Sequence, residues 1–320
     1  MSGDRTLPVW NPHAARVVER AVQRHAPDGA GPTTAQAATT DQIVVEEPLE
    51  IRIAWTERGL DPRGVRRGRV REPSEGSREI GGESLVVTMR TPGDDLDLAA
   101  GFLFTEGVLA APDDVAGIAH AGGSGPDAGN IVVVTPRADR PLSIGQARRI
   151  IRATAACGLC GKENIDAVRR RIRKIDNDGS DARLSLDVLA ALPAAVRAAQ
   201  PVFDATGGLH AVGLFDLDGT LIVAREDVGR HNAVDKVLGH QWRQGRRDFA
   251  RTVMMVSGRA GFEIIQKAAV AGVPIVAAVS APSSLAVDLA QEVGMTLIGF
   301  VRGRTANVYT HAFRISAPDR

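Results

Sequence analysis

Hydrophobic and polar residues alternate along short stretches in the first half of the chain. From Leu49 to Trp55 every second residue is apolar, a period of two that predicts a strand with one face in solvent. Residues 84–90 and 130–135 are further apolar runs of strand length, and residues 96–104 repeat apolar positions at the helical period. We therefore expect a small α+β domain over residues 43–145.

The pattern changes after residue 200, where apolar strands alternate with helices. Residues 203–215 and 221–224, joined by the turn sequence Asp-Leu-Asp-Gly, predict a hairpin. Beyond it we expect strands and helices in alternation, at 252–256, 260–271, 275–279, 284–293 and 295–301. This alternation is typical of a parallel sheet with crossover helices. The predicted fold class is therefore α/β, with a mostly parallel carboxyl-terminal sheet over residues 201–315.

Three further segments do not belong to these sheets. Residues 1–42 are rich in Ala, Pro, Thr and Gly without apolar periodicity, so we expect a disordered tail there. Residues 56–83 are crowded with Arg, Glu and Gly, which favours a surface loop. Residues 146–200 should form a largely helical segment that bridges the two domains. The helices expected in this region are at 145–155, 162–175 and 187–199.

Composition limits the function classes that remain. The chain has 39 basic and 38 acidic residues, a formal charge of +1, so it lacks the overall basic field on which nucleic-acid binding relies. No run of about 18 apolar residues occurs, and the first 25 residues have no apolar signal core. We expect no nucleic-acid partner, no membrane segment and a cytoplasmic location, where thiols stay reduced.

Both cysteines of the chain, Cys157 and Cys160, lie in one short glycine-containing stretch. Neither thiol has a distant disulfide partner, so the pair acts locally as a redox couple, as half of a metal site or as a sulfur nucleophile with a neighbour. The stretch follows a predicted helix and does not begin one. A thiolate there gains nothing from a helix amino terminus and needs nearby cations for stabilisation.

Hydroxyl and guanidinium groups follow the ends of the predicted parallel strands. Ser257 and Arg259 come after one strand, Ser280 after the next, and Arg302 and Arg304 after the last. Because the carboxyl ends of parallel strands meet at one edge of a sheet, where ligands bind, we expect these groups to gather there. Such groups, with backbone amides at helix starts, bind phosphate. The sequence therefore predicts a phosphate or pyrophosphate site.

Two histidines lie in unusually polar stretches near the start of the second domain. His210 begins the predicted hairpin, and His231 lies within the charged segment 226–236. An imidazole serves as an acid, a base or a partner that stabilises a thiolate. The alternative is that Asp227 caps the following helix and that the other charges of the segment are solvated.

Several segments of the chain, in this order, resemble the formate dehydrogenase accessory sulfurtransferases, the FdhD family. The resemblance runs from about residue 43 to residue 315. The segments are GDDLDLAAGFLFTEG at 93–107, ACGLCG at 156–161, TGGLHA at 206–211, EDVGRHNAVDKVLG at 226–239, SGRAGFEIIQKA at 257–268, SAPSSLAVDLA at 280–290 and GFVRGRTANVYTH at 299–311.

The resemblance implies a function and a set of site residues. A cysteine desulfurase would load sulfur as a persulfide on Cys157, with Cys160 as its partner, and the sulfur would pass to the molybdenum of a bis-molybdopterin guanine dinucleotide cofactor destined for formate dehydrogenase. It also implies a homodimer, no permanently bound metal and a carboxyl-terminal fold similar to the cytidine deaminases. The cofactor-binding segment would be Phe300, Val301, Arg302, Gly303, Arg304 and Thr305.

Three other functions compete with sulfur transfer for this sequence. A zinc deaminase needs His-x-Glu followed by Pro-Cys-x-x-Cys, but Ala156 precedes Cys157 and no His-x-Glu lies upstream. A thioredoxin-like oxidoreductase would place its cysteines at a helix start after the first strand. The serious alternative is a non-catalytic chaperone that binds the cofactor and escorts it to the apo-dehydrogenase.

Overall fold

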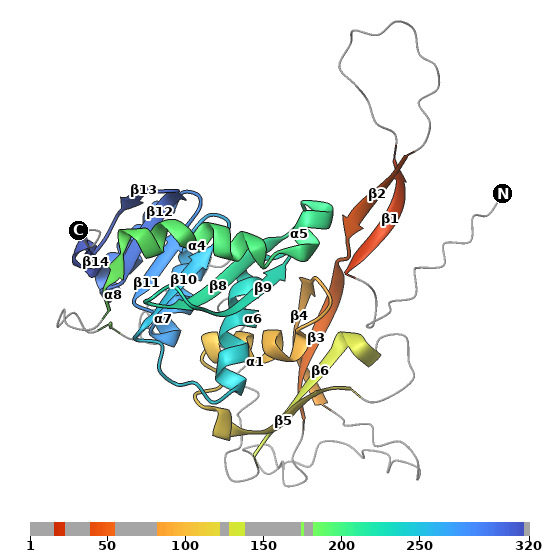
Figure 1. The fold of residues 1–320 in the computed structure, drawn as a ribbon. Helices are drawn as coiled ribbons and strands as arrows, with labels where there is room; N and C mark the ends of the chain where they lie inside the picture. Colours follow the sequence, from red (N-terminus) through yellow and green to blue (C-terminus); the bar gives the residue numbers. More distant parts are fainter. Residues whose placement is uncertain are drawn as a thin grey trace, which may run out of the picture.

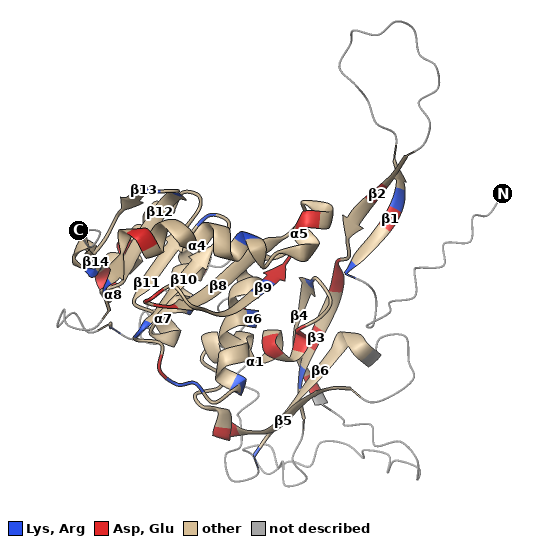
Figure 2. Cartoon of the chain, viewed as in Figure 1, with Lys and Arg blue, Asp and Glu red and all other residues tan. Residues whose placement is uncertain are grey.

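The computed structural model describes residues 16–22, 39–54, 82–121, 128–137, 174–175 and 182–316. These residues form a six-stranded and a four-stranded sheet, with helices packed between and around them (Figure 1). No helix of the described part is long and apolar enough to cross a membrane. Lys and Arg residues are scattered along the ribbon of both sheets and their helices (Figure 2).

The smaller sheet has the strand order β4-β3-β6-β5, and helix α1 packs on it. Leu49, Ile51 and Ile53 of β3 are buried and alternate with less buried residues, which confirms the strand predicted from the period of two. Its elements are β3 (Glu47–Ala54), β4 (Gly82–Arg90), α1 (Asp95–Thr105), the 3-10 turns Pro112–Asp114 and Ala128–Asn130, β5 (Val115–His120) and β6 (Ile131–Pro136).

The larger sheet has the order β13-β12-β11-β10-β8-β9. Its strands are β8 (His210–Asp216), β9 (Leu221–Asp227), β10 (Thr252–Val256), β11 (Ile275–Ala278), β12 (Thr296–Arg302) and β13 (Thr305–Val308). Only β10, β11 and β12 are parallel neighbours, so the prediction of a mostly parallel sheet is wrong. The β8–β9 and β12–β13 connections are short, and a parallel pair needs a crossover of about a dozen residues.

Helices cover both faces of this sheet. On one face lie α6 (Arg230–Arg243), α7 (Phe262–Ala271) and α8 (Ser284–Val293); on the other lies α4 (Leu186–Ala198). Helices α7 and α8 end at Gly272 and Gly294, which have φ angles of 82° and 80° that other residues adopt only with strain. The mixed α/β class is thus confirmed, whereas the likeness to cytidine deaminases stays a prediction.

The predicted strand at 203–215 is wrong in its first part. Helix α5 (Pro201–Thr206) occupies this stretch, and the strand begins only at His210. Pro201 suits the first turn of a helix, and the Glu226 carboxylate accepts hydrogen bonds from the Val202 and Phe203 amides. The helix therefore forms because a distant carboxylate satisfies its first amides, which local periodicity does not reveal.

An antiparallel ribbon of β1 (Val17–Val22) and β2 (Thr39–Val44) projects from the body (Figure 1). The prediction of a disordered tail is wrong for these strands. An ion pair of 2.7 Å between Arg16 and Asp94 fixes the base of the ribbon. Strands β7 (Leu184–Ser185) and β14 (Ile315–Ser316) pair next to a 3-10 turn at Ala312–Arg314. The predicted helices at 145–155 and 162–175 and the loop at 56–83 lie outside the described residues, apart from positions 174–175 and 82–83.

Helices α1 and α6 cross at two glycines, which brings their backbones very close. A Cβ at Gly101 would lie 1.8 Å from the Asp235 carbonyl oxygen, and one at Gly239 would lie 1.9 Å from that of Asp97. Neither helix has room for a methyl group at the crossing. Because they lack side chains, the two glycines allow α1, which packs on the smaller sheet, to lie directly against α6, which packs on the larger sheet.

We expect Gly101→Ala to destabilise the protein by about 3 kcal/mol, because the added methyl group overlaps backbone and the two helices must separate. Thermal unfolding of the purified variant measures the loss. Gly117→Ala is the matched control, since a Cβ at that position meets no atom within 4 Å. Equal unfolding temperatures for wild type and Gly101→Ala would contradict the close crossing.

Candidate functional site at the strand ends

One edge of the six-stranded sheet brings together residues from four strands. The parallel strands β10, β11 and β12 end there, and the antiparallel strand β8 begins there. The register pairs His210 with Asp227, the last residue of β9. The start of β8, the end of β9 and the loop after β10 therefore meet at the edge that the sequence predicted as an anion site.

Arginine side chains lie near His210 at this edge. Burial lowers the pKa of the imidazole, and the charges of Arg230, His231 and Arg259 lower it further, against an opposing effect of Asp227. His210 is therefore neutral at neutral pH, surrounded by cations. Three of the predicted site residues, His210, His231 and Arg259, are thus neighbours in the structure.

A cavity of about 680 Å³ opens beside His210, between helices α4 and α5 and the strand ends. Its size suits a small molecule or cofactor. Of the predicted site residues, Ser257 and His210 line it. The Ser257 hydroxyl oxygen accepts a hydrogen bond of 2.8 Å from the Ala211 amide. The cavity is otherwise lined by Pro193, Ala194, Val196, Arg197, Gln200, Phe203, Gly207, Gly208, Leu209, Met255, Gly258 and Val279.

Sequence reasoning missed three polar or aromatic lining residues: Arg197, Gln200 and Phe203. All three belong to α4, to α5 or to the junction between these helices. The available signal was Pro201, which favours the first turn of a helix and separates α4 from α5. Because Phe203 was predicted to begin a strand, helix α5 and its contribution to the cavity wall were not predicted.

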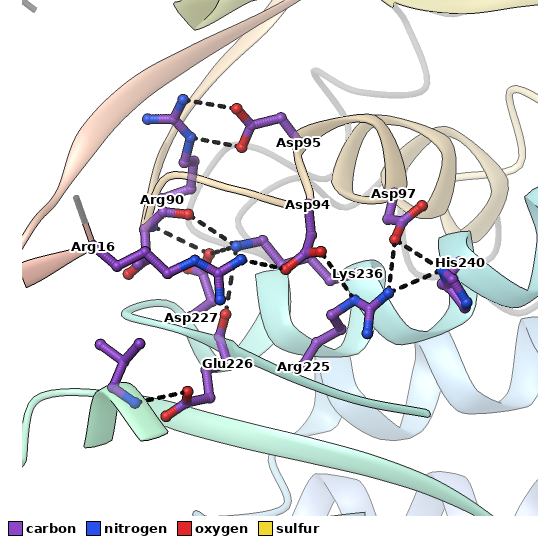
Figure 3. A network of polar contacts seen from close by, with 12 residues as sticks. Arg16, Arg90, Asp94, Asp95, Asp97, Arg225, Glu226, Asp227, Lys236 and His240 are labelled. Atoms are coloured by element: carbon purple, nitrogen blue, oxygen red, sulfur yellow. Dashed lines mark hydrogen bonds and ion pairs between the residues drawn. The ribbon is translucent and has the colours of Figure 1, made fainter. Parts of the chain in front are cut away.

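Two consecutive carboxylates at the end of β9 position both sides of the site (Figure 3). Glu226 accepts hydrogen bonds of 3.2 Å and 2.8 Å from the amides of Val202 and Phe203, which fixes α5. Asp227 accepts 2.8 Å and 3.0 Å bonds from the Gly229 amide and the Asn232 side chain, which fixes the start of α6. The end of β9 therefore holds both α5, which forms a wall of the cavity, and the start of α6, which carries cationic residues.

The Asp227 carboxylate is itself held by a buried lysine. Lys236 Nζ lies 2.7 Å from Asp227 Oδ2, and both side chains are inaccessible to solvent. The same ammonium group donates a 2.9 Å hydrogen bond to the carbonyl oxygen of Thr91, and the Thr91 amide donates one of 3.2 Å to Asp227. The alternative in which Asp227 caps α6 and the other charges of segment 226–236 are solvated is therefore wrong. The N-cap of α6 is Gly229, without a side-chain cap, and Glu226, Asp235 and Lys236 are buried.

His231 lies in the first turn of α6 and pairs with Glu263 of α7 at 2.8 Å. The hydrogen bond from His231 lowers the pKa of Glu263. Glu263 is therefore ionised at neutral pH and balances part of the positive charge at the edge. This carboxylate was not anticipated from the sequence.

The predicted cofactor-binding segment, residues 300–305, forms the end of β12 and its turn into β13. Phe300 is exposed, with a φ of 54°, and its amide donates to the Ser280 carbonyl oxygen at 3.2 Å. Arg302 is exposed, whereas Arg304 pairs at 2.8 Å with Asp187 in the first turn of α4. The segment shares the edge with His210 but does not line the cavity.

The outcome for the other predicted residues is mixed. Val301 is buried and packs in the core, so its side chain is not available to a ligand. Gly303, with a φ of 53°, and Thr305 make the exposed β12–β13 turn. Cys157 and Cys160 lie outside the described residues, and their predicted roles stay predictions.

Comparison with known proteins gives consistent results. The model of the FdhD/NarQ family matches residues 77–316. A curated protein of Nocardia farcinica named "Sulfur carrier protein FdhD" is 48% identical over 278 residues, covering 86% of this chain and 88% of its own. One of the same name from Streptomyces avermitilis is 46% identical over 304 residues, covering 94% and 96%.

A solved structure is similar in fold. It is the crystal structure of a Desulfotalea psychrophila protein provisionally described as a formate dehydrogenase accessory protein. The TM-score is 0.66 at 21% sequence identity, and the alignment covers 94% of this chain and all of the other. At this identity the similarity shows that the two chains share a fold.

Replacing Arg259 with glutamine should raise the pKa of His210, because a cation that disfavours the imidazolium is removed. Titration of the imidazole protons by NMR measures the shift. Arg247→Gln is the control, since it removes a cation from the exposed surface beyond the end of α6. An unchanged pKa of His210 in Arg259→Gln would show that Arg259 does not contribute to lowering it.

Proposed function

This chain belongs to the FdhD/NarQ family, and from that premise we propose that it is a sulfur carrier for formate dehydrogenase maturation. It takes sulfur from a cysteine desulfurase as a persulfide on Cys157 and delivers it to the Mo-bis(molybdopterin guanine dinucleotide) cofactor. The curated relatives that cover most of the chain carry the name of sulfur carrier. The structural observation that carries the proposal is the cationic strand edge around His210, which adjoins a ligand-sized cavity.

The loading step needs no external oxidant or reductant. The Cys157 thiolate attacks the terminal sulfur of the donor's cysteine persulfide, a new S–S bond forms, and the donor's S–S bond breaks. The donor cysteine leaves as a thiolate, so electrons balance between the two proteins. Cys160, three residues away, is suited to tune the reactivity of the loaded sulfur or to receive it next.

The molybdenum cofactor is the substrate here, and the strand edge has groups that fit its pyrophosphates. Arg230 and Arg259 place positive charge around His210, and Arg302 lies exposed at the end of β12. Among the described residues, Arg259 and Arg302 make no ion pair with a carboxylate, so their guanidinium groups are available to phosphate oxygens. Arg304 must exchange Asp187 for a phosphate before it contributes.

A second candidate is a chaperone that binds the cofactor and escorts it without carrying sulfur. The cavity and its cationic rim favour this reading, because a binding site for the cofactor serves an escort as well as a sulfur carrier. In this proposed function the protein acts as a cytoplasmic homodimer. A homodimer would give each cofactor, with its two guanine dinucleotides, a pair of equivalent edges.

We expect intact-mass spectrometry to find one added sulfur per chain after incubation with a cysteine desulfurase and cysteine, and a reductant to remove it. Cys157→Ala should abolish both this added mass and the activation of formate dehydrogenase, because the accepting thiolate is gone. Cys160→Ala serves as the comparison for the loading step alone: it keeps Cys157 and should still gain the added sulfur. Normal activation by Cys157→Ala would refute sulfur carriage and leave the chaperone as the explanation.

A further inference from the structure

An imidazole and a carboxylate face each other at the strand edge, and neither lines the cavity. Nε2 of His231 lies 2.8 Å from Oε2 of Glu263, and the two side chains come from the first turns of α6 and α7. Both side chains are partly exposed, at 31% and 38%. Because an exposed pair of this kind contributes little to stability, a chemical role accounts for it better than a structural one.

The pair leaves one nitrogen of the imidazole ring unused. The hydrogen bond from His231 lowers the pKa of Glu263, so the carboxylate is ionised at neutral pH and Nε2 carries the shared proton. Nδ1 of His231 has no hydrogen-bond partner among the residues that the structure describes, and it is accessible to solvent. In the neutral ring Nδ1 is then a free acceptor. A general base has this arrangement when a carboxylate orients its ring.

Two other histidines show what distinguishes this pair. His210, at the same edge, has no carboxylate within ion-pair distance in the described part of the chain, and burial and the nearby cations lower its pKa. His210 therefore holds no proton to transfer at neutral pH. The Asp97 carboxylate that His240 contacts is shared with two guanidinium groups. Glu263, by contrast, forms an ion pair within the described ranges with His231 alone.

The surroundings of the pair stabilise an anionic sulfur. The charged and titratable groups around it are Arg230, Arg259, His210, Lys267 and Asp227. Lys267 is neutralised by Asp235, and Asp227 is neutralised by Lys236, so the two arginines dominate the local charge. The pair also lies at the amino-terminal ends of α6 and α7, which carry partial positive charge. Cations and helix starts are the features that lower the pKa of a thiol.

The cysteine stretch needs such groups from elsewhere in the chain, because it follows a predicted helix and does not begin one. We propose that His231, oriented by Glu263, is the acid–base group of the sulfur-loading step. Nδ1 takes the proton of the Cys157 thiol, and the ionised Glu263 stabilises the imidazolium that forms. The Cys157 thiolate then attacks the terminal sulfur of the donor persulfide.

The step balances without a further reactant. The new S–S bond forms as the S–S bond of the donor breaks, and the electron pair of the broken bond leaves with the donor sulfur. The departing donor thiolate takes the proton back from Nδ1 of His231. One proton moves to the imidazole and returns, and the number of S–S bonds is unchanged.

This inference rests on the proposed function, because it names the group that activates the thiol accepting the persulfide. It also assigns His231 a different role from the predicted one. The imidazole moves a proton at a reacting sulfur, whereas the sequence placed it among the residues that bind the cofactor.

Alkylation of Cys157 by iodoacetamide in the full chain, measured by peptide mass spectrometry as a function of pH, tests the assignment without desulfurase or cofactor. In the wild type the rate should reach half its maximum well below pH 8.5, which is about the pKa of an ordinary thiol. His231→Ala should move the half-maximum towards that value and lower the rate at neutral pH by about tenfold, because the thiol has lost its base. Glu263→Gln should lower the rate less, since the amide oxygen still orients the ring.

His120→Ala is the matched control and should react like the wild type. It removes another partly exposed imidazole, at the end of β5, whose Nε2 lies 3.9 Å from a carboxylate oxygen of Asp95. Added imidazole separates proton transfer from structural support, because a free base can act where the side chain has been removed. Imidazole should restore part of the alkylation rate in His231→Ala and leave that of the wild type unchanged.

Three results would overturn the assignment. They are a wild-type pH profile in His231→Ala, a loss of rate that imidazole does not restore, and an NMR spectrum in which Nδ1 of His231 carries the proton of the neutral ring. Wild-type chain that gains sulfur from the desulfurase, with equal Cys157 reactivity in His231→Ala, would refute the role of His231 alone. A chain whose Cys157 reactivity depends on His231 but which never gains sulfur would refute sulfur carriage and retain the activated thiol.

Discussion

Two buried ammonium groups determine how the two sheets of this protein fit together. Lys236 is neutralised by Asp227 and donates to the carbonyl oxygen of Thr91, 145 residues away in sequence. Lys267 lies 2.8 Å from Asp235 and 3.0 Å from the hydroxyl oxygen of Thr105. Burial lowers the pKa of Lys267, but the carboxylates outweigh it and the pKa is raised. A buried charge that loses its partner costs about 3–5 kcal/mol, so alternative packings of the smaller sheet are strongly disfavoured.

The geometry of the candidate site depends on the buried pairing of Lys236 with Asp227. Asp227 is the neighbour of Glu226, and both end β9, so fixing one carboxylate by Lys236 also fixes the other. Through them the start of α6 and the start of α5 are held in register, although one carries the cationic rim and the other the cavity wall. A change in the buried network would therefore alter the candidate site without replacing any residue that lines the cavity.

Unpaired cations of this nearly neutral chain gather at one edge of the larger sheet. At the junction of the two sheets, Arg225 contacts Asp97 and pairs with Asp94 at 3.3 Å (Figure 3). Arg243 also contacts Asp97. These guanidinium groups are therefore already paired with carboxylates that hold the two sheets together. Among the described residues at the strand edge, Glu263 is the only carboxylate that forms an ion pair with Arg230, His231 or Arg259. Its partner is His231. Positive potential is thus concentrated at one place while the net charge stays at +1.

The sequence by itself determined the motifs and those elements whose pattern is local. The period of two in β3, the alternation of strands and helices after residue 250, and the serines and arginines after strand ends were all readable, because each depends on neighbouring residues. Tertiary structure decided the rest. Helix α5 depends on Glu226, the antiparallel pairing of β8 with β10 brings His210 to the strand edge, and Gln200 is buried only where α4 and α5 close on the sheet. These features arise from contacts between segments far apart in the chain, and local periodicity carries no information about such contacts.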